Sequence, residues 1–307
     1  MSENKIKNVF GTFDGISCGQ LALQKANIHY DNYYASEIKP VAIKVTQHNF
    51  PNTIQLGDIK SIKGSDFTDK IDLFIGGSVC KDLSSANKTR LGLQGIKSGL
   101  FYEYLRLYNE LKPTYFLLEN VKMPKTDEKE ISNLLGVNPI IIDSKLYTGG
   151  LRKRLYWTNI QFDSKNIIDK NIKLQDILEN GYTDRDKARC LLESDSRPLS
   201  TPLKMFHRYY GTGFSTLIFK DKHHYIDCKS HYDLNYKGNS ASEIDKIKDS
   251  IDNKIYDGVR YLTSNERLQL QTIPKDYLSL LTNNEISGVL GDCWTVDVIA
   301  DIFRGLK

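Results

Sequence analysis

Two residues of this sequence could together perform covalent chemistry on an electron-poor ring. Cys80 follows the strand-like run 72–75 and a turn of small residues, and Glu119 directly follows a second apolar run at 115–118. Because the carboxyl ends of neighbouring parallel strands meet at one edge of an open α/β sheet, we expect the thiol and the carboxylate to lie close together. A soft nucleophile beside an acid suits attack on the ring, followed by proton transfer to that ring.

Further polar features follow the first strands of the chain. The turn 13–19 contains two glycines, which let the backbone approach a ligand closely, but it lacks the GxGxxG spacing of a dinucleotide site. Glu37 closes the next predicted strand, where a carboxylate can accept the hydroxyls of a ribose, and Asp58 could receive an adenine amino group. Each of these alone is an ordinary turn or surface acid, whereas together they outline a nucleoside pocket.

Basic residues are concentrated in two places. Arg152 and Arg154 are two positions apart on a predicted strand and so point the same way, where they could hold a phosphate, brace a carboxylate such as Glu119, or form a solvated edge. Residues 204–237 carry six basic and three acidic side chains with aromatic residues between them, a composition that suits nucleic acid. Four histidines and a cysteine in this segment lack the spacing of a known zinc class, and we expect no metal.

The patterning of the chain indicates how these residues are positioned. Across residues 1–160, short apolar runs alternate with amphipathic stretches, which predicts an α/β fold with a mainly parallel sheet and helices on both faces. This pattern breaks across 161–257, and helical patterning returns in 258–307, where Thr263 and Glu266 have the spacing of a capping box. We therefore expect a large domain interrupted by a smaller insert.

Composition restricts the class of protein. The chain has 307 residues and a formal net charge of +4, which permits a nucleic-acid partner without requiring one. Its five cysteines are scattered and odd in number, which favours reduced thiols. No apolar stretch is long enough to span a bilayer, and the N-terminus has no apolar signal core. We expect a cytoplasmic protein without membrane contact.

The motifs, taken in order, resemble those of the cytosine-C5 DNA methyltransferases. The resemblance covers nearly the whole chain except the insert. It rests on Phe13-Asp14-Gly15, on Glu37 with Asp58, on Gly76-Gly77-Ser78-Val79-Cys80, on Glu119-Asn120-Val121, on Arg152-Lys153-Arg154, on 260–274 and on Gly291-Asp292-Cys293-Trp294. Seven segments in the family's order carry more weight than any one motif. Several details are more similar to the animal de novo class, and compact enzymes of this kind are familiar from bacteria and their phages.

The resemblance implies a Rossmann-like methyltransferase fold, a target-recognition region in 161–257, and methylation of cytosine C5 in double-stranded DNA by S-adenosylmethionine. The target base would leave the stack, because C6 is inaccessible inside a duplex. Cys80 as thiolate would attack C6, while Glu119 supplies a proton at N3. Arg154, with Arg152 as second candidate, would orient the base and Glu119. Loss of the C5 proton after methylation would expel Cys80.

The resemblance also implies a set of binding residues. Those implied for the cofactor are Phe13, Asp14, Gly15, Ile16, Glu37, Ile38, Asp58, Ile59, Gly77, Leu100, Cys293 and Trp294. Those implied for the substrate are Ser78, Val79, Ser84, Asn120, Lys220 and Lys222.

Three positions depart from the family pattern and motivate alternatives. Val79 stands where the family usually has proline, Lys81 where it has Asn or Gln, and Asp292 where it has Asn or Arg. Val79 would loosen the loop that proline fixes, which motivates a weak or inactive DNA-binding homologue as one alternative. A tRNA cytosine-C5 methyltransferase is the other. The retained catalytic residues favour an active enzyme and the large insert favours duplex DNA, while the recognition sequence, the biological role and the oligomeric state stay open.

Overall fold

The computed structural model describes residues 6–78, 99–191, 201–213, 215–247 and 251–306. The chain divides into two compact units, which are described separately. Unit 1 comprises Met1–Ser144, Lys153–Ile168 and Cys293–Lys307, and unit 2 comprises Lys145–Arg152 and Asp169–Asp292. Residues 258–292, which we grouped from the sequence with the large domain, thus lie in unit 2. Among the described residues, no helix combines the length and apolar character that a membrane crossing requires.

Unit 1 is built on a seven-stranded sheet with the order β3-β2-β1-β4-β5-β7-β6. The strands are β1 (Asn8–Thr12), β2 (Asn32–Ser36), β3 (Ile54–Gln55), β4 (Leu73–Gly77), β5 (Tyr115–Val121), β6 (Ile140–Asp143) and β7 (Lys153–Thr158). All pairings are parallel except those of β7, which runs antiparallel to both β5 and β6. The predicted α/β fold with a mainly parallel sheet is therefore confirmed.

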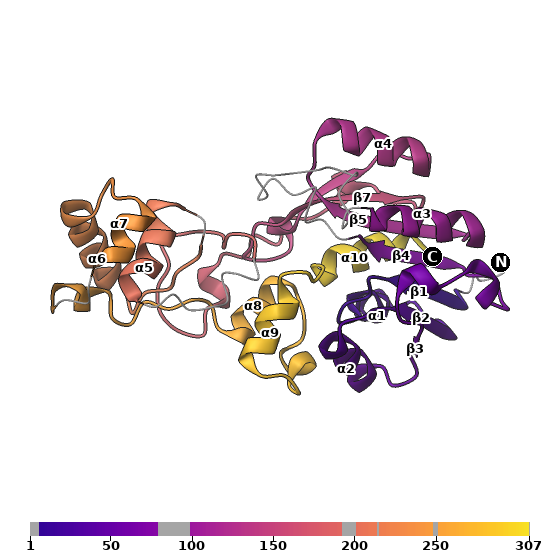
Figure 1. Cartoon of the computed structure of the whole chain (residues 1–307), viewed down its shortest axis with the longest axis horizontal. Coiled ribbons are helices and arrows are strands. Elements are labelled where there is room, and N and C mark those ends of the chain that lie inside the picture. The colour runs from indigo at the N-terminus through magenta and orange to yellow at the C-terminus, as the bar shows by residue number, and fades with distance from the viewer. Residues whose placement is uncertain (1–5, 79–98, 192–200, 214, 248–250, 307) are drawn as a thin grey trace. The chain divides into compact units, whose positions relative to one another are not determined.

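The central strands are apolar because both faces of the sheet are covered. Every residue of β1 is buried, and so are the first four residues of β4. The helices of unit 1 are α1 (Cys18–Lys25), α2 (Pro40–Asn49), α3 (Leu100–Leu111), α4 (Lys125–Leu135) and α10 (Val296–Phe303). Figure 1 shows α3 and α4 on one side of the sheet and α1 and α2 on the other. Continuous apolar strands of this kind are typical of parallel sheets buried on both faces.

The helix α10 brings the C-terminal segment back to the sheet of unit 1. It packs against α1, where Lys25 Nζ lies 2.7 Å from Asp297 Oδ1. At its N-terminus, the buried hydroxyl of Thr295 receives a hydrogen bond of 2.8 Å from Ser144 Oγ. The residue that immediately precedes this anchored position is Trp294, which is thereby fixed at the edge of the sheet.

Unit 2 has its own helices and its own core. The helices are α5 (Pro202–Phe206), α6 (Lys222–Asn235), α7 (Ala241–Lys246), α8 (Ser264–Leu270) and α9 (Asn283–Leu290). Across the chain, short 3-10 turns lie at Ile59–Ser61, Gly64–Asp66, Ser144–Leu146, Ser164–Asn166, Gln175–Ile177, Ile251–Tyr256, Lys275–Leu278 and Arg304–Leu306, and a π-helical turn lies at His207–Gly211. The predicted capping box of α8 is confirmed, since Thr263 Oγ1 accepts from Glu266 N and Glu266 Oε2 accepts from Thr263 N.

Several aromatic side chains of the insert, which we expected to contact nucleic acid, lie instead in a hydrophobic core. Phe206, Tyr209, Tyr232 and Tyr256 are buried against one another in the core of unit 2. Their rings meet mainly in tilted or edge-to-face arrangements, with centroids 5.2–5.9 Å apart for the contacts of Phe206 with the other three. Aromatic rings supply much of the apolar area of this core, together with aliphatic residues such as Leu203 and Ile244.

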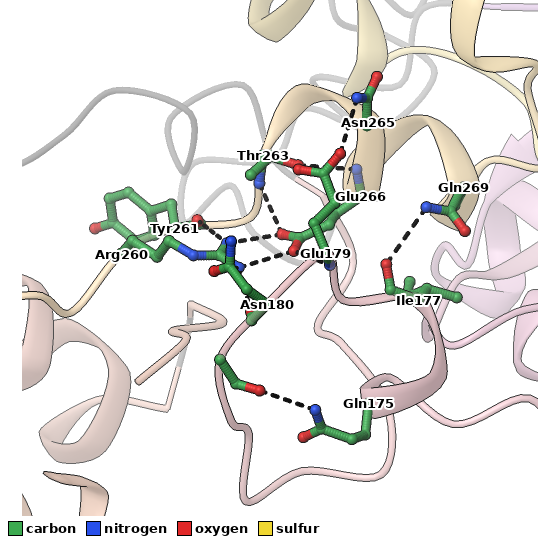
Figure 2. Close-up of polar contacts among 11 residues, drawn as sticks. Gln175, Ile177, Glu179, Asn180, Arg260, Tyr261, Thr263, Asn265, Glu266 and Gln269 are labelled. Carbon is green, nitrogen blue, oxygen red and sulfur yellow. Dashed lines mark hydrogen bonds and ion pairs between the residues drawn. The ribbon is translucent and has the colours of Figure 1, made fainter. Parts of the chain in front are cut away.

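A fully paired carboxylate holds several segments of unit 2 together (Figure 2). Glu266 has no exposed surface, and Arg260 donates to both of its oxygens, from Nη1 to Oε2 at 2.8 Å and from Nη2 to Oε1 at 2.9 Å. Backbone N–H groups of Glu179 and Thr263 donate to the same two oxygens. Arg260 also donates to the backbone oxygen of Asn180 at 2.6 Å. This network ties the segment 179–180 to the start of α8.

Candidate active site

A buried carboxylate at the end of β5 is the centre of the candidate site in unit 1. Glu119 is buried and lies opposite Gly77 in the register of β4 and β5. Its Oε1 lies 3.0 Å from Arg154 Nε, and its Oε2 accepts a hydrogen bond of 3.2 Å from Trp294 Nε1. Since each oxygen has its own donor, the plane of the carboxylate is fixed at the edge of the sheet.

Gly77 is required by this arrangement because of close approach. A Cβ at this position would lie 2.8 Å from Trp294 Nε1 and 3.1 Å from Glu119 Oε2. The first distance is shorter than non-bonded atoms tolerate, so a larger residue would displace the indole or the carboxylate. The absence of a side chain therefore lets both groups reach the end of β4.

The segment that leads to the predicted nucleophile is anchored by Asn120. The Nδ2 of this buried residue donates to Ser78 Oγ at 2.9 Å and approaches the Ser78 carbonyl at 3.4 Å. Its Oδ1 in turn accepts from Val121 N at 2.8 Å. The predicted site residues Val79, Cys80 and Ser84, which continue this segment, lie outside the described residues, as does Lys81.

The two predicted arginines have separate surroundings. Arg154 belongs to β7 and contacts Glu119, which is one of the roles that the sequence left open for it. Arg152 precedes β7 and lies in unit 2, so the two do not share a strand. Arg152 is buried, and its Nη1 donates to the Gly291 carbonyl at 3.3 Å and approaches Cys190 Sγ at 3.7 Å.

The turn after β1 is held by the carboxylate of Glu37. Phe13, Gly15 and Ser17 all have left-handed backbone angles, with φ of 52°, 58° and 59°. Gly15 N donates to Glu37 Oε2 at 2.8 Å, while Ile38 N and Lys39 N donate to Oε1 at 2.7 and 2.9 Å. A carboxylate has about four acceptor positions, so these three donors leave capacity on Oε2 for a ligand.

Asp14, in the middle of this turn, has an enclosed carboxyl group. Its Oδ1 accepts from Tyr33 Oη at 2.6 Å, whereas Oδ2 is buried and accepts from none of the residues that the structure describes. Burial raises the pKa of Asp14 to about 7, against the lowering effect of the Tyr33 and Ser17 hydroxyls, and the charge of Glu37 raises it further. A carboxyl group with this pKa exchanges its proton near neutral pH.

The remaining residues implied for the cofactor have varied exposure. Asp58 is exposed, and its Oδ1 accepts from Lys60 N at 3.0 Å, while the neighbouring Gly57 carbonyl accepts from Ser36 Oγ at 2.8 Å. This bond places the residues after β3 beside the end of β2. Of the others, Ile16, Ile59 and Cys293 are buried, Leu100 is partly buried at the start of α3, and Ile38 is 66% exposed.

The lysines proposed from the insert lie at the start of α6. Lys220 and Lys222 are exposed, and Asp221 between them caps the helix through a hydrogen bond of 2.8 Å from His224 N to its Oδ1. The histidines of the insert are engaged elsewhere: His207 Nδ1 bonds Tyr232 Oη at 2.6 Å, and His231 Nδ1 bonds Tyr256 Oη at 3.1 Å. Within the described ranges, no three His, Cys, Asp or Glu side chains gather as a metal site would require.

The contact between Trp294 and Glu119 is the feature that sequence reasoning missed. The sequence placed Trp294 with the cofactor, through the resemblance, and placed Glu119 with the nucleophile. The two residues are separated by 175 positions, and no periodic pattern connects them. Only the packing of α10 against α1 brings the indole to the carboxylate.

Comparison with known proteins gives a consistent result. Residues 8–138 match the model of the C-5 cytosine-specific DNA methylase family. The type II methyltransferase M.NgoBV of Neisseria gonorrhoeae is 30% identical over 203 residues, which cover 59% of this chain and 48% of that protein. The type II methyltransferase M1.ScrFI of Lactococcus lactis is 28% identical over 322 residues, which cover 96% of this chain and 76% of that protein. The chain thus spans about half the length of the Neisseria relative.

A solved structure shares the fold over the full length of the chain. The methyltransferase EhMeth of Entamoeba histolytica superimposes with a TM-score of 0.70 at 16% sequence identity, covering 99% of this chain and 98% of that one. At this identity the agreement concerns the fold, which is the one predicted from the sequence.

Proposed function

Because residues 8–138 match the model of the C-5 cytosine-specific DNA methylase family, we propose that this chain methylates cytosine C5 in DNA through a covalent bond between Cys80 and a flipped-out base. The observation that carries the proposal is the buried Glu119, held by Arg154 and Trp294 at the strand end beside Gly77. An acid fixed at this edge can protonate a ring that enters from solvent.

The residues after β1 and β2 fit the cofactor that this family uses in general, S-adenosylmethionine. Glu37 keeps acceptor capacity on Oε2 for a ribose hydroxyl, and the exposed Asp58 can accept from an adenine amino group. When bound, the cofactor supplies the methyl group. The residues that we assign to holding it are Phe13, Asp14, Gly15, Ile16, Glu37, Ile38, Asp58, Ile59, Gly77, Leu100, Cys293 and Trp294.

The roles of the catalytic residues follow from the chemistry of the ring. The Cys80 thiolate forms a bond to C6 as N3 takes a proton from Glu119, which makes C5 nucleophilic. After C5 has gained the methyl group, loss of the C5 proton lets the C6–sulfur bond break. Arg154 orients Glu119 through Oε1, and we retain Arg152 as a second candidate for orienting the base.

The base would be approached by residues around the end of β4. Asn120 fixes Ser78 through the bond to its hydroxyl, and Ser78 directly precedes Val79 and Cys80 in the sequence. We assign Ser78, Val79, Ser84 and Asn120 to contacts with the substrate. Because the covalent step needs a defined path of the chain before the thiol, this anchoring supports the proposal.

A transfer assay tests the proposed function. We expect methyl groups from labelled S-adenosylmethionine to enter duplex DNA and not tRNA. We also expect DNA with 5-fluorocytosine to trap the wild type covalently, since fluorine cannot leave as a proton does. Cys80→Ser should neither transfer nor become trapped, because a hydroxyl is a far poorer nucleophile than a thiolate. Transfer to tRNA alone would establish the alternative substrate, and cofactor binding without any transfer would indicate an inactive homologue.

The insert 161–257 is our candidate for recognition of double-stranded DNA. Lys220 and Lys222 are exposed, and they can neutralise phosphates. Reversing both charges should reduce the slope of log affinity against log salt by about two. The matched control reverses Lys112 and Lys129, two exposed lysines of unit 1, for the same change in net charge. Equal salt slopes in the two variants would show that Lys220 and Lys222 do not contact DNA.

A further inference from the structure

We propose that Trp294 is a positioning residue for Glu119, in addition to bordering the cofactor turn. The inference rests on the proposed function for its catalytic consequence. Its structural core is independent of that function, since it is the hydrogen bond of 3.2 Å from Trp294 Nε1 to Glu119 Oε2. An indole N–H donates but never accepts, and it does not titrate in the range of protein function. This donor therefore stays in place whether Glu119 is ionised or protonated.

The two oxygens of the Glu119 carboxylate are bound by two different donors, a guanidinium and an indole. Arg154 Nε lies 3.0 Å from Oε1, and the indole of Trp294 is bonded to Oε2. Rotation of the carboxyl group would break both contacts at once, so its plane is fixed. Each oxygen keeps a further lone pair, and the proton that Glu119 delivers must occupy one of these. The pair of donors thus sets the direction in which the acid points.

The position of the indole is itself determined by its neighbours. Gly77 provides the space at one edge of the ring, because a Cβ there would meet Nε1 at 2.8 Å. At another edge, a Cβ on Gly19 of α1 would lie 3.7 Å from Cζ3, which is ordinary van der Waals contact. Thr295, the next residue, is buried and bonded to Ser144. One ring therefore spans the distance between the first helix and the catalytic carboxylate.

A single substitution can distinguish the two roles of Trp294, which are positioning Glu119 and packing against the cofactor. Trp294→Phe keeps an aromatic ring beside α1 but removes the N–H. We expect the single-turnover rate at saturating DNA and cofactor to fall about tenfold, since misplacing an acid slows proton transfer. Cofactor affinity should change by less than about threefold, because the ring is retained. If the affinity falls and the saturated rate stays at the wild-type level, Trp294 only packs against the cofactor and the proposal is overturned.

A matched control uses the other tryptophan of the chain, since there are two. Trp157 lies on β7, and its Nε1 donates to Ser132 Oγ at 3.0 Å, so its N–H serves the core. Trp157→Phe should lower stability while leaving the rate per folded molecule unchanged. A rate loss in this variant equal to that of Trp294→Phe would show that the loss is a general effect of removing an indole.

A spectroscopic test is independent of activity. With ¹⁵N-labelled indoles, the protein should give two Nε1–H signals, assigned by the two Phe variants. Glu119→Gln should move the Trp294 signal upfield, because the bond to a charged oxygen is either replaced by a bond to the neutral amide oxygen or lost to the NH₂ group. The Trp157 signal should stay unchanged. An unmoved Trp294 signal would overturn the proposed hydrogen bond. If the signal moves but the wild type transfers no methyl group, the proposed function fails and the contact stands.

Discussion

Two Glu–Arg pairs with a buried carboxylate, one in each unit, differ in how completely that carboxylate is paired. In unit 2, each oxygen of Glu266 accepts one bond from Arg260 and one from a backbone N–H (Figure 2). In unit 1, each oxygen of Glu119 has one donor among the described residues, Arg154 on Oε1 and Trp294 on Oε2. A carboxylate with about four acceptor positions is saturated in the first case and keeps spare capacity in the second.

This difference in pairing distinguishes an ion pair that stabilises the fold from one whose carboxylate can still bind a ligand or a proton. A saturated carboxylate can neither take up a proton nor approach a ligand without giving up a bond, so Glu266 can only hold chain segments together. Glu119 can be oriented by two donors and still present a lone pair to a ring. The presence of an arginine partner does not distinguish Glu266 from Glu119, because both have one. The number of donors on each carboxylate oxygen does distinguish them.

The largest effect is expected at the unsaturated carboxylate. Glu119→Gln keeps the shape of the side chain but cannot deliver a proton, so the single-turnover methylation rate should fall by about 10²–10⁴-fold. The melting temperature should fall modestly, because the amide has one acceptor oxygen and its NH₂ group faces the other donor, so the rate is compared per folded molecule. The rate is measured by quench-flow with labelled cofactor. A rate within about twofold of the wild type would show that Glu119 is not the acid.

The saturated carboxylate should show the opposite behaviour. Glu266→Gln leaves Arg260 without its charged partner, and we expect unfolding in urea to require about 2–3 kcal/mol less free energy, since Arg260 is partly exposed. The methylation rate per folded molecule should not change. Glu103→Gln removes the charge from a more exposed pair with Arg106, and its loss should stay below about 1 kcal/mol. Equal losses in the two variants would show that saturation adds no stability.

The parts of this comparison were not equally predictable from the sequence. The sheet was predictable, because the apolar runs before Gly77 and Glu119 have the length and composition of buried parallel strands. The capping box identified Glu266 as a residue of the first turn of α8, but nothing local indicated its bond to Glu179 N, which is 87 positions away. The contact of Trp294 likewise depends on helix packing between distant segments. Long-range pairing of polar groups leaves no periodic signal.

The aromatic residues of the insert show a second limit. Phe206 and Tyr232 alternate with charged residues in the sequence, and the same composition describes a surface that binds nucleic acid and a small aromatic core. The structure shows the core, with both rings buried. Pattern alone could not decide, because an insert of this size must bury some of its rings, and the sequence does not say which.

The third enclosed carboxyl group, Asp14, extends the comparison to a group that is paired on one side, and its effect on stability per pH unit should be the smallest. Its pKa is raised by burial from 3.8 to about 7, so the folded protein binds this proton more tightly than the unfolded chain. The stability that this proton contributes is present below about pH 4 and is lost as the pH rises to about 7. The loss cannot exceed about 1.4 kcal/mol per pH unit for one group.

Two variants test this in urea unfolding without cofactor between pH 4 and 8. Asp14→Asn cannot ionise, so the decrease in stability across that window should become shallower than in the wild type. Tyr33→Phe removes a hydroxyl that lowers the pKa of Asp14, so the decrease should extend to higher pH. If Asp14→Asn leaves the pH dependence unchanged, the carboxyl group is ionised throughout the window. A bound water would then donate to Oδ2 and complete the hydrogen bonding of the carboxylate. Asp14 would in that case be fully paired, as Glu266 is, and would differ from Glu119.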